Sequence, residues 1–352
     1  MQSRRRQVVL LSLAVALFGA CSSANEVASS GAPAGEAEAS SSEDADAAVA
    51  IDASKDASKN ATKDAAKDAS DAAAPVTAGC DPTKPFSTYT PLLAVSTSVS
   101  APHTGSETIR GAHVTADERT VLFVVNFSLV PDEIFTATRS SITAPFGPRR
   151  AELGLNNGVE PEGSLWMTDD ALTAYITSQA GPGNGLNRLY RFTRAAVGAS
   201  WSGSTLAPGL IEAGSTDRLA TPFVANDHIY FSRYANNGPV RLYEASLVGA
   251  PALHPVSELN VGTAASYPVL TPDALTIFWV DNRINMNVFS VWRADRSTTT
   301  DPFSNARPAI NITNGRAFVP VGVSADACRL YVIGSPLVAG TGQDQEIAVL
   351  GR

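Results

Sequence analysis

Residues 267–296, YPVLTPDALTIFWVDNRINMNVFSVWRADR, form the stretch from which the fold is predicted. The stretch contains an extended segment, a turn at 271–274 (TPDA), an apolar strand, a polar loop and a second apolar strand that ends at Arg296. Its central strand at 277–280 (IFWV) is apolar on both faces, which is typical of a strand packed between neighbouring sheets. We therefore expect a protein built from packed β-sheets.

Versions of this unit occur five times in the chain. They share one aspartate in the first turn, and these residues are Asp117, Asp170, Asp227, Asp273 and Asp326. Successive aspartates lie 53, 57, 46 and 53 residues apart. A period near fifty residues with strand-rich content predicts the blades of a propeller rather than a helical solenoid. We expect each aspartate to cap its turn by accepting hydrogen bonds from backbone amides two residues further on.

Each copy is predicted to contribute four strands to one sheet. The fourth strand is the weakest signal and is predicted at 151–156, 205–211, 253–260 and 309–313. The fifth copy ends before it reaches a fourth strand, so the segment 86–96 is predicted to complete that sheet and close the ring. Residues 80–352 are therefore predicted to form a single all-β domain, a five-bladed β-propeller. A sixth sheet hidden in part within the N-terminal segment is the alternative.

The first 20 residues are typical of an export signal. A basic start at 4–6 precedes an apolar run at 8–20, which is too short to span a bilayer as a permanent helix. The end of this run, 17–21 (LFGAC), resembles the lipobox of bacterial lipoproteins, with Phe18 where leucine is usual. The resemblance implies cleavage before Cys21, lipid attachment to Cys21 and a place in the bacterial cell envelope, with Ser22 favouring the outer membrane. An ordinary secretory signal is the alternative.

Residues 21–79 are predicted to be a disordered tether between the lipid and the propeller. The segment consists mainly of Ala, Ser, Gly, Asp, Glu and Lys and has no aromatic residue. Such a composition cannot bury enough apolar surface to offset the entropy of ordering. The domain that follows is weakly acidic, with 19 basic and 23 acidic residues from Cys80 onward. A surface of this kind does not attract phosphate backbones, so nucleic acid is not an expected partner.

Two cysteines remain if Cys21 carries lipid. Cys80 precedes the strand that closes the ring, and Cys328 lies in the turn of the last copy. Such a pair persists as a disulfide in an oxidising compartment. We expect Cys80 and Cys328 to be bonded, and two free thiols are the alternative.

The turn at 271–274, the strand at 277–280 and the loop at 281–283 (DNR) are similar to the TolB-type, WD40-like (PD40) β-propeller repeat. The resemblance covers residues 107–350 and is best in the fourth copy. No copy has glycine after the aspartate, the third copy is shortened around Asn226, and the first copy lacks the loop arginine. The resemblance implies the fold and suggests protein partners in the envelope, but it does not imply an activity.

Charged residues cluster where each inner strand is expected to begin, about ten residues before the turn aspartate. The candidate ligand-binding residues are Glu107, Arg110, Glu162, Asp217, Arg218 and Arg316, with Glu160 and Thr263 at the equivalent places of two copies. In a five-bladed ring these positions converge on one mouth of the central channel. A partner protein, a peptide or a glycan is the expected ligand, and ordinary solvated loop charge is the alternative reading.

Standard catalytic and metal-binding signals are absent from the sequence. It has no Gly-x-Ser-x-Gly elbow and no phosphate-binding glycine loop, and its four histidines share no metal-ligand spacing. We therefore expect a monomeric binding or scaffolding module without cofactor, metal or enzyme activity. The rival is a five-bladed glycosidase that uses three of the mouth carboxylates. It requires two of Glu107, Glu160, Glu162 and Asp217 to lie about 5 to 10 Å apart and to face one cavity. A purely structural envelope protein is a third reading.

Overall fold

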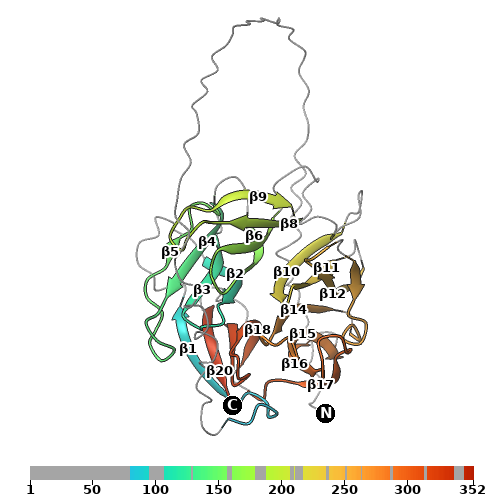
Figure 1. The fold of residues 1–352 in the computed structure, drawn as a ribbon. Helices are drawn as coiled ribbons and strands as arrows, with labels where there is room; N and C mark the ends of the chain where they lie inside the picture. The colour runs from blue at the N-terminus through green and yellow to red at the C-terminus, as the bar shows by residue number, and fades with distance from the viewer. Residues whose placement is uncertain are drawn as a thin grey trace, which may run out of the picture. The chain divides into compact units, whose positions relative to one another are not determined.

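The computed structural model is an all-β protein (Figure 1). It describes residues 80–94, 107–127, 130–156, 161–178, 188–206, 210, 217–234, 238–249, 252–262, 264–285, 288–312, 315–336 and 345–352. Within these ranges no helix is long and apolar enough to cross a membrane. The predicted signal peptide, the lipidation of Cys21 and the tether at 21–79 lie outside the described residues.

Five sheets of four antiparallel strands form the propeller, which confirms the predicted fold. Blade 1 contains β2 (Glu107–Val114), β3 (Thr120–Phe127), β4 (Val130–Thr138) and β5 (Arg150–Ala151). Blade 2 contains β6 (Pro161–Met167), β7 (Thr173–Ser178), β8 (Arg188–Thr193) and β9 (Ser202–Leu206). Blade 3 contains β10 (Arg218–Ala225), β11 (His228–Tyr234), β12 (Val240–Ser246) and β13 (Leu253–Pro255). Blade 4 contains β14 (Ala265–Leu270), β15 (Thr276–Asn285), β16 (Val288–Asp295) and β17 (Ser304–Pro308).

Blade 5 is built from both ends of the domain. It contains β18 (Arg316–Val323), β19 (Arg329–Pro336) and β20 (Glu346–Gly351), and its outer strand is β1 (Thr88–Ala94). The prediction that an N-terminal segment completes the last sheet is therefore confirmed. Just before β1, Phe86 exchanges backbone hydrogen bonds with blade 4, from its N–H to Ala309 (2.8 Å) and from the N–H of Asn311 to its carbonyl oxygen (2.9 Å). Cys80 and Cys328 are joined by a disulfide.

The outer strands differ from the prediction. Those of blades 2 and 4 begin three and five residues earlier than predicted, at 202 and 304, so β17 does not overlap the predicted 309–313. Those of blades 1 and 3 are shorter than predicted. Only two residues of blade 1 and three of blade 3 pair as a fourth strand, and the chain then turns. In these turns an asparagine side chain takes over the pairing. The N–H of Ile134 donates to Oδ1 of Asn156, and the N–H of Leu242 donates to Oδ1 of Asn260, each at 2.8 Å. A side-chain amide thus supplies the hydrogen bond that a longer fourth strand would make.

Four of the five first turns share one hydrogen-bond pattern. Oδ1 of Asp117, Asp170, Asp273 and Asp326 accepts from the backbone N–H two residues on, at 2.8–3.0 Å. The residue after each aspartate has a positive φ of 55–61° although none is glycine. Blade 3 departs from the predicted pattern, because Asn226 (φ 48°) and Asp227 (φ 60°) are themselves the two residues at the tip of a tight hairpin.

An arginine at the end of the third strand locks three of these turns. Nε of Arg139, Arg194 and Arg296 donates to the carbonyl oxygen of Glu118, Ala171 and Ala274, respectively, at 2.6–2.8 Å. Each guanidinium also stacks on an aromatic ring of the next loop, Phe146, Trp201 or Phe303, at 4.3–4.7 Å from the ring centroid. In blade 5, Arg352 stacks in the same way on Phe86 at 4.2 Å. This repeated clamp was not predicted from the sequence.

Candidate functional site

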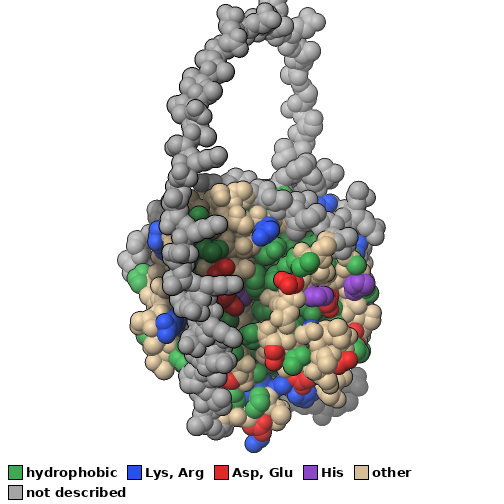
Figure 2. Space-filling view, in the orientation of Figure 1, with side chains coloured by type: hydrophobic (Ala, Val, Ile, Leu, Met, Phe, Trp, Pro, Cys, Tyr) green, Lys and Arg blue, Asp and Glu red, His purple; other side chains and the backbone are tan. Residues whose placement is uncertain are grey.

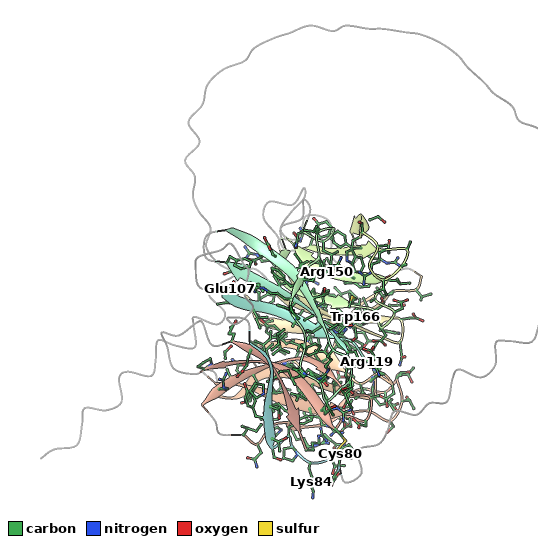
Figure 3. All side chains as sticks on the ribbon, turned by 90° about the vertical axis from the view of Figure 1, so that its left-hand side faces the viewer. Cys80, Lys84, Glu107, Arg119, Arg150 and Trp166 are labelled. Atoms are coloured by element: carbon green, nitrogen blue, oxygen red, sulfur yellow. A yellow bond between two sulfur atoms is a disulfide. The ribbon has the colours of Figure 1, made fainter. Side chains whose placement is uncertain are left out.

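The five inner strands, β2, β6, β10, β14 and β18, surround a central channel. In every blade the inner strand comes before the second and third strands in the sequence; β1, the outer strand of blade 5, comes earlier in the chain. The inner strands therefore run in the same direction, and their N-terminal ends lie at one end of the channel. We call this end the mouth, and we call the opposite end, which carries the first turns of the blades, the turn face. Figure 3 shows Glu107, at the mouth, and Arg119, at the turn face, at opposite ends of blade 1.

Glu107 is held in a bidentate pair at the mouth. Its two carboxylate oxygens accept hydrogen bonds of 2.8 and 3.0 Å from Nη1 and Nη2 of Arg149. The guanidinium of Arg149 stacks on Phe135, 4.6 Å from the ring centroid, and its side chain is only 7% exposed. The pairing occupies both oxygens of the carboxylate, which fixes its position and leaves little of it for acid or base chemistry.

Arg110 and Asp217, two other charged residues predicted at the mouth, are also paired. Nε of Arg110 lies 3.2 Å from Oδ2 of Asp132 on β4. Asp217 precedes β10, and its Oδ2 lies 2.5 Å from Nη2 of Arg233 on β11. Its backbone carbonyl accepts a 2.9 Å hydrogen bond from Nη1 of Arg188, so blades 2 and 3 are linked at this point.

Blade 5 presents Arg316 at the mouth. Nη1 of Arg316 lies 2.9 Å from Oε1 of Glu346 on β20, and the hydroxyl of Tyr89 on β1 donates to the same oxygen. Burial, followed by this hydrogen bond and the charge of Glu346, raises the pKa of Tyr89 above its ordinary value. Tyr89 is therefore a neutral donor at physiological pH, and the N-terminal strand takes part in ordering the mouth.

Glu107, Arg110, Asp217 and Arg316 thus each find an ion-pair partner within their own blade. The partners Arg149, Asp132, Arg233 and Glu346 were not identified from the sequence. Arg218 begins β10 and is partly exposed. Glu162 lies in β6, but its side chain is outside the described part of the chain, as are Glu160 and Thr263.

Halfway along the channel the inner strands leave a small cavity of about 30 Å³. It is lined by the middle residues of all five inner strands, among them His113, Ser164, Thr221, Tyr267 and Val321. Ligand pockets usually measure about 300 to 1,000 Å³, so the cavity has no room for a sugar ring. The described residues also contain no group of three or more His, Cys, Asp or Glu side chains able to hold a metal ion.

The turn face is held together by contacts from blade to blade. Oδ1 of Asp169 accepts a 2.9 Å hydrogen bond from the N–H of Ala116, which joins blade 2 to blade 1. The carbonyl oxygen of Asp273 accepts one of 3.1 Å from Nδ2 of Asn226, which joins blade 4 to blade 3. Acidic side chains lie around the central hollow of this face (Figure 2). Because four of the turn aspartates cap backbone amides, their carboxylates are structural parts of the ring.

A buried charged network closes the ring between blades 1 and 5. The Glu118 carboxylate accepts two hydrogen bonds of 2.7 Å from Arg329 and one of 2.5 Å from the hydroxyl of Tyr331. The Tyr331 oxygen in turn accepts a 2.7 Å bond from Nη2 of Arg139. Hydrogen bonding to Glu118 raises the pKa of Arg329, and burial followed by the same partner raises that of Tyr331. Both groups therefore keep their protons at physiological pH.

No protein-family model matches the chain, and no curated protein matches it. One similar solved structure is TolB from Acinetobacter baumannii, with 13% identity and a TM-score of 0.39 over 70% of this chain and 55% of that one. Another is the alpha-L-arabinofuranosidase of Podospora anserina in complex with cellotriose, with 12% identity and a TM-score of 0.47 over 77% of this chain and 98% of that one. A third is Zg3597, a family 117 glycoside hydrolase of Zobellia galactanivorans, with 12% identity and a TM-score of 0.46 over 74% and 88%.

These likenesses concern the fold alone, and the proteins behind them differ in function. The chain spans only 55% of the length of the TolB chain above. The resemblance to the PD40 repeat of TolB-type propellers therefore stays a prediction, while the five-bladed propeller itself is established by the sheet topology.

Proposed function

We propose that this protein is a binding or scaffolding module of the bacterial cell envelope, whose mouth recognises a protein, a peptide or a glycan. In this proposal the chain is a monomer, is held at the outer membrane by lipid on Cys21, and has no enzyme activity. The observation that carries the proposal is the set of fixed ion pairs at the mouth: Glu107 with Arg149, Arg110 with Asp132, Asp217 with Arg233, and Arg316 with Glu346.

Ion pairs of this kind suit recognition better than catalysis. Their charged groups are pre-oriented by neighbours within one blade, so a partner meets a surface whose geometry is already set. Both signs of charge occur side by side, which favours a partner with mixed polar groups over a polyanion. A glycosidase instead needs two carboxyl groups free to transfer protons or attack carbon, and Glu107 and Asp217 each have an arginine on their oxygens.

The test is affinity capture from bacterial envelopes with the full-length chain and with a mouth variant. Arg110→Gln with Arg316→Gln removes two positive charges whose side chains are each 25% exposed. The matched control is Arg119→Gln with Arg150→Gln, which removes the same charge from exposed positions away from the mouth (Figure 3). Circular dichroism and thermal unfolding establish that all three proteins are folded.

A partner captured by the wild type and the control but lost by the mouth variant supports the proposal and locates the site. Equal capture by all three proteins excludes the mouth as the binding surface. Glycan hydrolysis assays run in parallel address the rival function. Hydrolysis by the wild type that is lost in Glu107→Gln or Asp217→Asn would overturn the binding-only proposal.

The lipid anchor is tested separately. In a bacterial host supplied with labelled fatty acid, the wild type is expected to carry the label and to fractionate with the outer membrane. Cys21→Ala is expected to lose both. A wild type that is secreted without label would show that the first 20 residues are an ordinary signal.

A further inference from the structure

His113 occupies an unusual position in the middle of the channel. It lies on β2, is 5% exposed and lines the central cavity. Its ring packs against Trp166, 5.4 Å away between centroids, and against Phe223 at 6.0 Å. The imidazole therefore reaches from blade 1 to the inner strands of blades 2 and 3.

The two ring nitrogens of His113 have different surroundings. A hydrogen bond with the backbone of Met167 favours the protonated ring, so the acceptor of this bond is the carbonyl oxygen of Met167. Nε2 is buried and has no hydrogen-bond partner among the residues that the structure describes, so the bond to Met167 belongs to Nδ1. Burial lowers the pKa of His113 to about 3, and the ring is neutral at physiological pH. In this tautomer Nε2 carries a lone pair and accepts hydrogen bonds.

The backbone around the cavity is irregular at the same level of the channel. All five inner strands have a register shift here, between Ile109 and Gly111 in β2 and at matching places in the others. In β10 and β14 the shift contains Thr221 (φ 54°) and Tyr267 (φ 55°), each followed by proline. Positive φ at such residues is strained, and strain of this kind clusters at functional sites. A bulged residue also leaves backbone groups outside the ladder.

We propose that the middle of the channel binds a neutral hydrogen-bond donor of one or two heavy atoms, accepted by Nε2 of His113. The donor is an O–H or N–H group, either of a water molecule or of the end of a ligand that enters from the mouth. A ligand that enters from the mouth rests on the proposed function, whereas a bound water molecule does not.

The size and the chemistry of the cavity support this class of ligand. A volume of about 30 Å³ exceeds what one water molecule needs and is too small for a ring. The cavity residues named above include three hydroxyl side chains, Ser164, Thr221 and Tyr267, but no carboxylate. A water molecule is held by two to four polar groups, and His113, the hydroxyls and the bulged backbone can supply them. A cation would lack a compensating charge among the lining residues.

The distance between the mouth and His113 determines the shape of a ligand that could reach both. Arg110 lies three residues before His113 on β2, which corresponds to about 10 Å along a strand. A ligand bound at the mouth ion pairs would therefore reach His113 only through a narrow extension that ends in a hydroxyl or an amide.

The first test is nitrogen NMR of the histidines in the full-length chain at pH 7, with His113 assigned by the signal lost in His113→Gln. We expect a protonated Nδ1, and an unprotonated Nε2 shifted upfield from the position of an acceptor without a partner. A protonated Nε2, or an Nε2 at the unbonded position, would overturn the proposal.

The second test is a high-resolution crystal structure of the same protein purified without added ligands. An isolated oxygen within about 3 Å of Nε2 identifies water. Density that continues toward Arg110 identifies the end of a ligand, and repeating the experiment with methanol as a probe shows whether the position exchanges. An atom with several oxygen neighbours at about 2.0 to 2.6 Å would be a cation and would contradict the proposal.

Discussion

Cys80 and Cys328 are joined by a disulfide although 248 residues separate them, and their Cα atoms lie 6.1 Å apart. The bond ties the segment that leads into β1 to the first turn of blade 5. It therefore fastens the N-terminal strand to the sheet that this strand completes, which is the point where the propeller ring closes.

Reduction of this disulfide is expected to lower the stability of the folded ring. In the chain-entropy model a bond across so long a loop stabilises by about 5 kcal/mol, as an upper bound. Urea unfolding of the wild type with and without reductant measures the change, and the variant Cys80→Ser with Cys328→Ser is the control, since reductant should not affect it. Equal unfolding midpoints for the oxidised wild type and the variant would show that the bond does not hold the ring.

The buried carboxylate of Glu118, between blades 1 and 5, is also expected to stabilise the closed ring. Glu118→Gln keeps the size of the side chain but removes the carboxylate that binds Arg329 at 2.7 Å, and it leaves the more distant Asp326, at 3.9 Å, as the remaining anion. Breaking a buried ion pair by removing one member costs about 3 to 5 kcal/mol. The free energy of unfolding should fall by this order, while Arg119→Gln at the exposed next position should change it little. A loss no larger than that of Arg119→Gln would contradict the role of the network.

The arginine clamps can be tested in blade 2, where two arginines lie three residues apart. Arg194 donates to the carbonyl oxygen of Ala171 at 2.6 Å and stacks on Trp201, whereas Arg191 on β8 is exposed. Arg194→Lys loses the planar fork that makes both contacts, and we expect a destabilisation of about 1 to 2 kcal/mol. Arg191→Lys is the matched control. Similar unfolding midpoints for the two variants would mean that the clamp does not stabilise the blade.

Acid should destabilise the propeller in part through His113. Burial lowers the pKa of His113 from 6.5 to about 3 in the folded state. Between these values the unfolded chain binds a proton that the folded chain does not, so stability is lost as the pH falls. The slope is about 1 kcal/mol per pH unit, and the contribution is constant above pH 6.5.

The measurement is the free energy of unfolding of the wild type and of His113→Gln at pH 7, 6, 5 and 4. Carboxylates also titrate in this range, so the difference between the two proteins isolates His113. The variant should lose less stability on acidification. Parallel curves would show that His113 is accessible to protons in the folded protein.

The turns and the ring closure illustrate what a repeat in the sequence can predict. An aspartate recurring every fifty residues beside apolar strands indicated the blades, because backbone capping is a local interaction between residues close in sequence. The missing fourth strand of the last copy pointed to the segment at 86–96, because a propeller must close. Blade 3 departs from the pattern because Asn226 and Asp227 tolerate positive φ and form a shorter turn by themselves.

The outer strands were predicted less well because edge strands carry weak patterns. At 152–156 and 256–260 the chain turns, and Asn156 and Asn260 complete the third strand with side-chain amides. Alternation of apolar and polar residues contains no information about a side chain that replaces a backbone partner. Similarly, the arginines of the clamps are 22 to 24 residues from their turn aspartates in blades 1, 2 and 4, and only packing shows that they touch the turn.

The amino-acid sequence by itself determined the all-β class, the five repeats and the turn aspartates, because these depend on patterns within fifty residues of chain. Only the tertiary structure decided which charged residues pair at the mouth and at the ring closure, and which side chains line the channel. Glu107 meets Arg149 across 42 residues, and Arg329 meets Glu118 across 211. In the sequence, nothing distinguished His113 from the other three histidines. Its Nε2 is a candidate binding atom only because five strands from different parts of the chain enclose it.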